Sequence, residues 1–513
     1  MKTSQLFLSI MIVLLIAVAP FSHAIDSSIL APSSIASSKI TPSITKLANC
    51  EAKNATCYRA ELPETKQSHQ MVSIDIQYWQ ATGERLNPYP IVWLMGGPGR
   101  SNLNPPMPDW VWEHFDVLAV GYRGIDGSPR LDCPKLRQQF KFESKNRDDD
   151  FLSTITLARL SQKVESCQQN WGNKGINTQA YGIYEVVEDI DQVRKMLGFD
   201  KINLLSVSYG TRIAWYFDQL KPGVVDRSLI MSGNPDGGFF FDPYYTQLQL
   251  LTLEGLCDQD DYCQSKLPNL SQTIKSVLTN LPDKAWGVFL DADQIRLVTF
   301  MMLYSKDSIP MVIDAYSKAS QGNYSGLVAM QKYPNPFAKK DWVWGTFLSA
   351  GSIDLTQRTT FELTLEQTAS TTVLNSPLSE LLYGGITKGW KSREYQPLQN
   401  HNTNTPTLIF GSDIDLATPI ERIQKLWMPF IKNGSLLNVV GAGHAPDHMF
   451  AGGPQLEKHM LNFLQTGTHT TQQTFGTAFD FKAKFSLSLI IYAFWGVIGL
   501  LISALIIVIA LVL

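Results

Sequence analysis

A serine at a tight turn between two regular elements is the residue of this chain best placed to do chemistry. The apolar run 202–207 has the pattern of a buried strand and ends at Ser208, and the residues after it follow a helical pattern. A strand, a sharp turn and a helix around small-x-Ser-x-Gly form a nucleophile elbow, which exposes the serine oxygen at the carboxyl edge of a sheet. Gly210 fits this pattern, whereas Ser206 stands where glycine is usual. We therefore predict Ser208 as a nucleophile, with a serine in an ordinary turn as the alternative.

A serine nucleophile needs a base that takes its proton and an acid that orients the base. In this arrangement the two follow the serine in the chain order Ser, Asp or Glu, His. Downstream, the predicted strand 407–410 runs into a polar loop that holds two acids, Asp413 and Asp415. The pattern by itself does not choose between them.

One of the eight histidines stands where the base is needed. The predicted strand 436–440 leads to His444, so the serine, the acidic loop and this histidine all follow predicted strands. Because the carboxyl ends of parallel strands meet at one edge of a sheet, one surface can gather the three groups. We predict His444 as the base, with His448 as the second choice and a purely structural histidine as the alternative.

The developing negative charge of an acyl-transfer transition state needs hydrogen-bond donors. The predicted strand 91–95 runs directly into Gly96-Gly97-Pro98-Gly99. Glycines let backbone N–H groups point at a substrate, while Pro98 has no N–H and stiffens the turn. We predict the N–H groups of Gly97 and of Tyr209, the residue after the nucleophile, as the oxyanion donors. The spacing is not G-x-G-x-x-G, which argues against a dinucleotide site, and a simple tight loop is the alternative.

Short apolar runs that alternate with helical patterns must position these groups, and this alternation is typical of an α/β fold with a mainly parallel sheet. The predicted strands are 91–95, 117–120, 202–207, 228–231, 407–410 and 436–440. In 184–198 the apolar residues fall on one helical face, and Gly198 ends the helix. From 234 to 401 the pattern loosens into mixed helical and aromatic segments, which we interpret as a mostly helical cap inserted between strands.

Composition limits the kind of partner. The chain has 513 residues with 43 Lys and Arg against 46 Asp and Glu, a formal net charge of -3. This near-balance argues against nucleic acid as the main partner, because phosphate binding needs a basic excess or a clustered basic patch. With 44% hydrophobic and 17% charged residues, the chain can bury a large core.

Both ends of the chain carry apolar segments of the kind that membranes accept. The charged start Met1-Lys2, the apolar run 6–21 and a small-residue end form a secretory signal with cleavage after Ala24, and an uncleaved anchor is the alternative. No charged residue occurs in 485–513, which is longer than the ~20 residues that a helix needs to cross a bilayer. We predict a C-terminal transmembrane anchor there, and small residues at 476–478 keep a lipid-anchor signal as an alternative. Either interpretation places the body on the exported side, periplasmic or extracellular.

The cysteines fit that compartment. They are Cys50, Cys57, Cys133, Cys167, Cys257 and Cys263, an even number with no CxxC spacing. An even number in an exported chain favours disulfides, and pairing by nearness joins the first with the second, the third with the fourth and the fifth with the sixth. Six cysteines can pair in many other ways, and buried free thiols are the alternative.

These patterns predict the organisation of the whole chain. The predicted segments are a signal peptide (1–24), a flexible leader (25–49), a first part of an α/β core (50–233), the cap (234–401), a second part of the core (402–468), a linker (469–484) and the transmembrane anchor (485–513).

The same motifs give the chain a resemblance to the α/β-hydrolase exopeptidases of the prolyl aminopeptidase and tripeptidyl aminopeptidase type. The segments that carry it are Gly96-Gly97-Pro98-Gly99, Tyr122-Arg123-Gly124-Ile125-Asp126-Gly127-Ser128, 189–211, Asp415-Leu416-Ala417-Thr418-Pro419 and Gly443-His444, within 90–230 and 405–450. The form Ser208-Tyr209-Gly210-Thr211 and the cysteines at 133 and 167 are more similar to the tripeptidyl branch. Met95, Ser206 and the pair Gly121-Tyr122 depart from the residues usual in this family.

The resemblance implies an α/β-hydrolase fold and a serine exopeptidase that removes one or a few residues from peptides with a free N-terminus. It selects Asp415 as the triad acid, with Asp413 as the fallback. Acyl transfer to Ser208 with His444 as the base needs neither a metal nor an organic cofactor, so we expect none.

An exopeptidase must also hold the free ammonium group of its substrate, which in a water-poor pocket demands a carboxylate. The candidates in the predicted cap are Glu254, Asp258, Glu362, Glu366 and Glu380, and the sequence does not choose among them. Trp342, Trp344 and Trp390 are candidates for an apolar subsite, with core packing as the alternative.

Two other functions fit the same residues. An esterase or lipid acyl hydrolase would use the same triad, and a membrane anchor would hold it near lipid substrates. Removal of a cap carboxylate would cripple the exopeptidase and hardly affect the esterase. A catalytically silent binding module is the second alternative, and the presence of Ser208, Asp415 and His444 argues against it.

Overall fold

The computed structural model describes the chain from Thr41 onward, with short gaps, as one unit. The described residues are 41–140, 150–237, 239–333, 336–351, 354, 364, 367, 371–393, 398–445, 447–448, 452–469, 474–476 and 479–512. The predicted signal peptide and most of the predicted leader lie outside the described residues.

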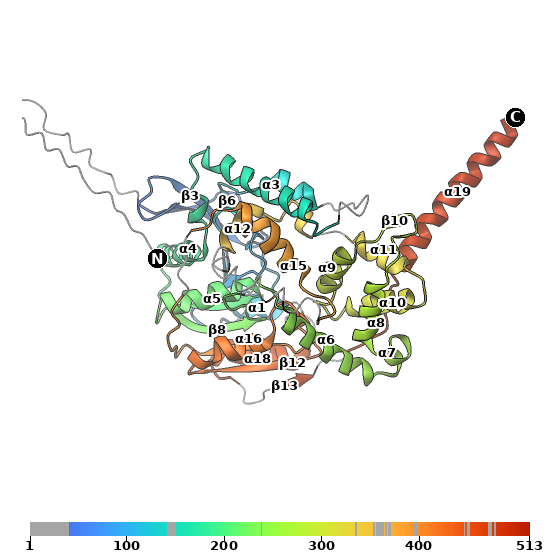
Figure 1. Cartoon of the computed structure of the whole chain (residues 1–513). Coiled ribbons are helices and arrows are strands. Elements are labelled where there is room, and N and C mark those ends of the chain that lie inside the picture. Colours follow the sequence, from blue (N-terminus) through green and yellow to red (C-terminus); the bar gives the residue numbers. More distant parts are fainter. Residues whose placement is uncertain are drawn as a thin grey trace, which may run out of the picture. The chain divides into compact units, whose positions relative to one another are not determined.

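A sheet in the order β1-β2-β3-β5-β4-β7-β8-β11-β12-β13, with β6 paired to β3, forms the centre of the fold (Figure 1). The strands are β1 (Ser43–Lys46), β2 (Thr56–Pro63), β3 (Met71–Trp79), β4 (Ile91–Leu94), β5 (Val117–Val120), β6 (Gly127–Ser128), β7 (Ile202–Val207), β8 (Val225–Met231), β11 (Thr407–Gly411), β12 (Gly434–Val440) and β13 (Thr474–Gly476). Neighbours from β5 to β13 run parallel, whereas β1, β2, β3 and β6 pair antiparallel. The predicted mainly parallel sheet is therefore confirmed, and each of the six predicted strands is present.

The central strands are buried on both faces, which explains why their sequences are continuous apolar runs. Every residue of β4, β5 and β7 is buried. Successive side chains point to opposite faces of a sheet. Along β4, Val92 packs into the core layer that also holds apolar residues of α4 and α5, while Trp93 packs into the layer with α1 and α18. Helices on both faces thus fix the sheet edge where the predicted site residues emerge.

The helices of the core follow the strands as expected for an α/β fold. They are α1 (Asp109–His114), α2 (Pro134–Arg137), α3 (Thr154–Gly172), α4 (Ile183–Met196), α5 (Tyr209–Leu220), α16 (Ile420–Leu426) and α18 (Gly453–Thr466). The helix predicted over 184–198 is confirmed as α4, and Gly198 follows it with a φ of 80°. A positive φ of this kind favours glycine after a helix, which is why the sequence marks this end clearly.

The N-terminal edge of the sheet contains strands that the sequence analysis does not predict. β3 alternates between buried and half-buried residues, as a strand with one covered face does. β1 pairs antiparallel with β2. β1 lies within the predicted flexible leader 25–49, so the last residues of that segment belong to the sheet.

Helices dominate the chain between β8 and β11, where the sequence analysis places a cap. They are α6 (Pro243–Asp258), α7 (Asp261–Lys266), α8 (Leu270–Thr279), α9 (Ala292–Met302), α10 (Ile309–Ser320), α11 (Ser325–Gln331), α12 (Trp344–Ala350) and α15 (Pro377–Ser379), with a small hairpin of β9 (Lys284–Ala285) and β10 (Val288–Phe289). Their apolar residues form a separate core layer. Leu160 and Val164 of α3, which precedes the nucleophile in the chain, pack into the same layer. The layer above the sheet therefore also uses a segment outside the predicted cap.

Three disulfides tie surface segments together in this structure. They join Cys50 to Cys57, Cys133 to Cys167 and Cys257 to Cys263, the pairing given by nearness in the sequence. The second bond fastens the start of α2 to α3, and the third fastens the end of α6 to α7.

A long apolar helix, α19 (Ser488–Val512), follows the core. Its segment Ser488–Ile509 has a mean hydropathy of 2.5, and its large apolar side chains are mostly exposed. The helix begins beside α11, close to the β9–β10 hairpin (Figure 1). Just before it, Ser486 donates a hydrogen bond to the Asp314 carboxylate of α10 at 2.7 Å and accepts one from Lys318 of α10 at 2.6 Å. One turn into α19, the Tyr492 ring lies 5.5 Å from that of Trp286 in the hairpin.

Candidate active site

The turn between β7 and α5 has the geometry of a nucleophile elbow. Ser208 adopts φ 51° and ψ −124°, a region that residues other than glycine rarely occupy. Its backbone N–H donates to the carbonyl of Met231 in β8, and its own carbonyl accepts from Thr211 N in the first turn of α5. A backbone held in such a region costs free energy and is typical of functional sites. The predicted turn is therefore confirmed as a strained one.

Close packing explains the small residues around this serine. A Cβ added to Gly210 would lie 2.1 Å from the carbonyl oxygen of Leu94, and one added to Gly96 would lie 2.5 Å from the Cβ of Ser208. Ser206, where glycine is usual, is fully buried, and its hydroxyl donates to the carbonyl of Leu229 at 3.3 Å. The departure from the common pattern is thus accommodated by a hydrogen bond to the neighbouring strand.

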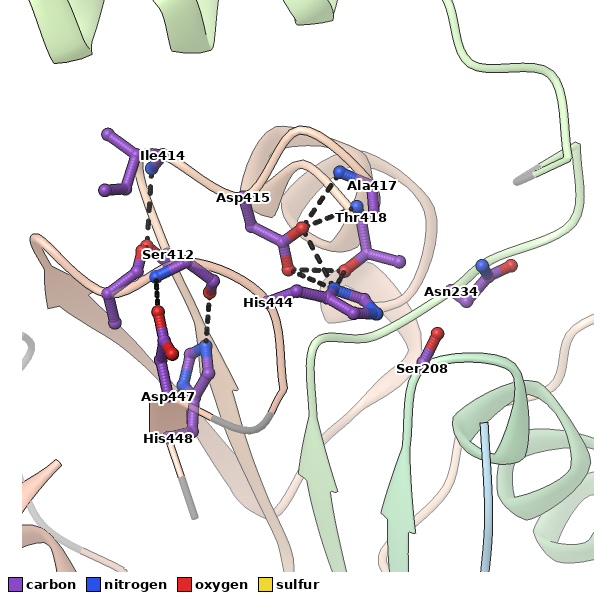
Figure 2. A network of polar contacts seen from close by, with 12 residues as sticks. Ser208, Asn234, Ser412, Ile414, Asp415, Ala417, Thr418, His444, Asp447 and His448 are labelled. Carbon is purple, nitrogen blue, oxygen red and sulfur yellow. Dashed lines mark hydrogen bonds and ion pairs between the residues drawn. The ribbon is translucent and has the colours of Figure 1, made fainter. Parts of the chain in front are cut away.

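The predicted base and acid lie together. The Nδ1 atom of His444 is 2.9 Å from Oδ2 and 3.0 Å from Oδ1 of Asp415 (Figure 2). The carboxylate also accepts hydrogen bonds from the N–H of Ala417 at 2.9 Å and from the N–H and hydroxyl of Thr418 at 3.0 and 2.7 Å. Because a carboxylate only accepts, Nδ1 must carry the proton, which leaves Nε2 of the neutral ring free to act as a base.

The charge of Asp415 is stabilised although its side chain is fully buried. Burial by itself raises the pKa of a carboxyl group. Here His444 and the hydrogen bonds from Thr418 outweigh burial, so that the pKa of Asp415 lies below its usual range. This residue therefore remains ionised at neutral pH and can orient and stabilise a protonated imidazole.

The other candidate acid and base have different surroundings. Asp413 accepts a hydrogen bond from Gly441 N at 3.3 Å, and burial raises the pKa of its carboxyl group. His448 is fully buried, with Nε2 3.2 Å from the carbonyl of Gly443, and burial lowers its pKa to about 4. Neither residue lines the cavity at Ser208. The structure thus brings Asp415 and His444 together and leaves the two second choices outside.

Ser208 and His444 line the same cavity. Figure 2 shows the Ser208 hydroxyl on the side of the imidazole away from the Asp415 carboxylate. In the part of the chain that the structure describes, no direct hydrogen bond joins the two side chains. In structures without substrate, catalytic hydrogen bonds are often long and tighten when substrate binds.

The two predicted oxyanion donors also line this cavity. Tyr209 is the first residue of α5, and the first N–H groups of a helix have no acceptor within it. Gly97 adopts a φ of 72°, and the Arg100 side chain lies over its Cα, where an added Cβ would be 3.0 Å from Arg100 Cδ. Both N–H groups therefore belong to the backbone that surrounds Ser208.

The cavity has a volume of about 510 Å³ and a mainly apolar lining. The large apolar side chains that line it include Phe239, Phe241, Met301, Met302, Tyr304, Tyr333, Phe337, Trp342, Phe347, Leu378 and Leu382. Among the described residues of this lining, the charged side chains are Arg100 and Lys339, and none is a carboxylate.

The tryptophans and acids predicted to bind substrate differ in their position relative to the cavity. Trp342 lines the cavity, whereas Trp344 and Trp390 are buried in the helical core layer. Glu254, Asp258 and Glu380 lie away from the cavity lining. The two remaining cap acids, Glu362 and Glu366, lie outside the described residues.

Sequence analysis missed a buried polar group next to the nucleophile. Arg212 of α5 is fully buried and donates to Oδ1 of Asn234 at 2.5 Å, to the Asn234 carbonyl at 3.1 Å and to Asp354 at 3.1 Å. Asn234 lines the cavity. The available sequence signals were a cation within an apolar helical stretch and a polar residue just beyond the carboxyl end of a strand.

A second missed group ties the base to the helical layer. The backbone N–H of His444 donates to the carbonyl of Tyr304, just after α9, at 2.5 Å. The Asp447 carboxylate accepts from Gly443 N at 2.8 Å, from Lys306 N at 2.9 Å and from the Ser305 hydroxyl at 3.1 Å. The loop that carries His444 is therefore bonded to the connection between α9 and α10.

Comparison with known proteins identifies the fold and distant relatives. A family model described as alpha/beta hydrolase fold matches residues 89–251, which include β4, β7 and the elbow. The chain is 27% identical over 152 residues to "Putative hydrolase YuaR" of Escherichia coli K12, covering 28% of each protein. It is 29% identical over 165 residues to serine protease Hip1 of Mycobacterium tuberculosis H37Rv, covering 30% of this chain and 31% of Hip1. The chain thus matches these relatives over about three tenths of their length.

Solved structures align with a larger share of the chain. An epoxide hydrolase of Bacillus megaterium aligns at 16% identity and a TM-score of 0.33, covering 77% of this chain and 98% of that one. An epoxide hydrolase of an endophytic Streptomyces aligns at 10% identity and a TM-score of 0.36, covering 83% of this chain and 100% of that one. With the family match and the sheet topology, the predicted α/β-hydrolase fold is confirmed, and part of the chain has distant sequence similarity to Hip1.

Proposed function

We propose that this chain is a serine peptidase of the acyl-enzyme type, with Ser208 as nucleophile, His444 as base and Asp415 as the acid. The observation that carries the proposal is the strained Ser208 turn in the same cavity as an imidazole whose Nδ1 is held by a buried carboxylate. This arrangement fulfils the roles of nucleophile, base and orienting acid.

In the proposed reaction, Nε2 of His444 takes the proton from Ser208 as the serine oxygen attacks the substrate carbonyl. The N–H groups of Gly97 and Tyr209 stabilise the oxyanion, and Asp415 stabilises the imidazolium. The protonated His444 then gives its proton to the leaving group, and an acyl-enzyme forms. Attack by water, again with His444 as the base, releases the acid and restores Ser208.

The proposal that the substrate is a peptide with a free N-terminus rests on two supports. One is the resemblance of the motifs around Ser208 and Asp415 to exopeptidases, and the other is the distant relation to the serine protease Hip1. Recognition of the ammonium group needs a carboxylate close to the cavity. Of the five cap acids predicted for this role, Glu254, Asp258 and Glu380 do not line the described part of the cavity, while Glu362 and Glu366 lie outside the described residues and stay predictions.

A second candidate function is hydrolysis of carboxylic esters, including lipid esters. The observation that favours it is the cavity lining, which is mainly apolar and has no carboxylate among its described residues. An apolar acyl chain would bury against these side chains without the need for a charged partner.

We further propose that the enzyme acts on the exported side of a membrane, anchored by α19. Support comes from the length and hydropathy of Ser488–Ile509, which suit a bilayer span, and from three disulfides, which are typical of oxidising compartments. Protease protection of membrane vesicles, with and without detergent, tests the side on which the body lies.

The two candidate functions are separated by a substrate panel on the full chain in detergent. The panel contains fluorogenic peptides with a free amine, their N-acetylated counterparts and short acyl esters, with Ser208→Ala as the control. Cleavage restricted to free-amine peptides and lost in the control supports the exopeptidase. Ester turnover without peptide cleavage moves the function to an ester hydrolase, and inactivity on both classes contradicts the catalytic proposal.

A further inference from the structure

The side-chain amide of Asn234 stands in the cavity at Ser208 in a fixed orientation. Asn234 follows β8, the neighbour of β7 in the sheet, and is 5% exposed. Its backbone N–H donates to the hydroxyl of Thr211 at 2.9 Å, and its carbonyl accepts from Nε of Arg212 at 3.1 Å. Both backbone polar groups of Asn234 are thereby bonded to α5, the helix that begins directly after the nucleophile.

The partner of the side chain decides which amide atom faces the cavity. Nη2 of Arg212 is 2.5 Å from the side-chain oxygen of Asn234. A guanidinium group has only donors, so the atom that faces it must be the amide oxygen. The NH₂ group therefore points the other way, and within the described residues it donates no hydrogen bond. Since no described residue accepts from it, this donor remains available beside Ser208.

Arg212 is itself held so that this orientation cannot relax easily. The Asp354 carboxylate accepts from Arg212 at 3.1 Å and from the N–H groups of Gly237 and Phe239 at 2.7 and 2.8 Å. The guanidinium group also lies 5.0 Å from the centre of the Phe239 ring, which lines the cavity. A buried charge with this set of partners is costly to move, because each lost hydrogen bond would leave a buried polar group unpaired.

The position of Asn234 separates it from the proposed oxyanion donor Gly97 and from the leaving group. The loop with Gly97 follows β4, which flanks β7 on the side opposite β8. In Figure 2, His444 and Asn234 flank Ser208 on different sides. His444 must be next to the leaving group, since it donates a proton to it. Asn234 is therefore placed on the acyl side of the scissile bond.

We propose that Asn234 is a substrate-binding residue whose NH₂ group donates to a second carbonyl oxygen in the acyl part of the substrate, next to the scissile bond. This inference rests on the proposed function and deepens it, because it names a chemical feature of the preferred substrate. The acyl part would carry an amide or similar acceptor. A donor cannot bind an ammonium group, so the recognition of a free amine falls to other residues.

Two umbelliferyl esters that differ in that acceptor test the proposal for a peptidase and an esterase alike. One carries alanylalanine with a free amine, and the other carries the same group with its amide replaced by a trans carbon–carbon double bond, which keeps the chain length, the methyl branches and the amine but not the acceptor. The measured quantity is the ratio of kcat/KM for the first ester to that for the second, in the full chain and in Asn234→Ala and Asn234→Asp. The aspartate variant keeps the size of the side chain and an acceptor for Arg212, but it replaces the donor with a second acceptor.

We expect the ratio to fall about tenfold in Asn234→Ala, the effect of one hydrogen bond, and further in Asn234→Asp, where two acceptors face each other. Asn280→Ala and Asn280→Asp are matched controls at an exposed site at the end of α8, and they should leave the ratio unchanged. An equal fall on both esters, or an unchanged ratio in both Asn234 variants, would overturn the proposal. Labelling of Ser208 by a fluorophosphonate distinguishes failure of the Asn234 proposal from failure of the proposed function. A wild-type chain that neither labels nor hydrolyses either ester contradicts the proposed function itself.

Discussion

The Asp447 carboxylate accepts a hydrogen bond of 2.8 Å from the backbone N–H of Gly443, the residue directly before His444. The same carboxylate accepts from Lys306 and Ser305 in the connection between α9 and α10. The base of the proposed triad is thus held in place from two directions, by Asp415 at its ring and by Asp447 at its loop.

Loss of the Asp447 contacts should reduce turnover more than binding. Asp447→Ala removes three hydrogen bonds at once, so we expect kcat to fall at least about tenfold, with KM changed less than threefold. Steady-state kinetics on the best substrate of the panel measures both constants. Asp413→Ala is the comparison, because the Asp413 carboxylate contacts Asn438 of β12 and Gly441 just after this strand rather than Gly443. A rise of KM with constant kcat in Asp447→Ala would contradict the positioning role.

Replacement of Asp415 by asparagine should abolish most activity while the fold persists. The amide cannot stabilise an imidazolium and can favour the wrong tautomer of His444, so kcat should fall on the order of 10⁴-fold. Asp413→Asn is the isosteric control and should retain activity within about threefold. If the Asp413 variant were the inactive one, the roles of the two acids would have to be exchanged.

His448 should make stability depend on pH between its folded and unfolded pKa values. Its folded pKa is about 4, below an ordinary value of about 6.5, because burial disfavours the charged ring. Between these values the unfolded chain binds a proton that the folded chain does not, so the free energy of unfolding rises with pH. The loss from pH 7 to pH 4 should be about 3 kcal/mol from this residue.

Urea unfolding of the wild type and of His448→Gln at a series of pH values measures this contribution. Glutamine can keep a donor for the Gly443 carbonyl, which His448 contacts through Nε2, but it does not titrate. The difference in unfolding free energy between the two proteins should therefore change with pH in that interval. Parallel curves would show that His448 is not buried in its neutral form.

A methyl group at Gly210 should destabilise the elbow. The added Cβ would meet the Leu94 carbonyl at 2.1 Å, and because this atom belongs to the backbone of β4, strand or helix must shift. We expect Gly210→Ala to lose about 3 kcal/mol of stability and nearly all activity. Gly172→Ala, where no atom lies within 4 Å of the added Cβ, is the matched control and should unfold near the wild-type temperature. Calorimetry of the two variants checks the difference.

The parts of this fold that the sequence predicts are those with strong local signals. The central strands β4, β5, β7 and β11 are predominantly apolar runs because both faces of the sheet are covered, and α4 has a clear apolar face that ends at Gly198. The edge strands β1 to β3 were missed because a strand with one covered face alternates only weakly. β1 was also hidden in a segment whose composition resembles a loose leader.

The site also contains residues that the sequence predicts and residues that only the folded structure shows. Ser208 and His444 follow apolar strands, so their positions were predictable from chain order and turn residues. Whether Asp413 or Asp415 would reach His444 depends on the course of a loop, which periodicity does not encode. Arg212 and Asn234 are brought together across two elements, and only the folded arrangement shows that the cation orients the amide.

The contacts at the start of α19 have a geometric consequence for the reaction. Ser486 is bonded to α10, and the connection into α10 is bonded to the loop of His444. With α19 in a bilayer, these links would hold the helical layer, and Ser208 under it, at a set height above the lipid surface. The distance of a scissile bond from the membrane would then help to decide which surface-bound substrates are cut.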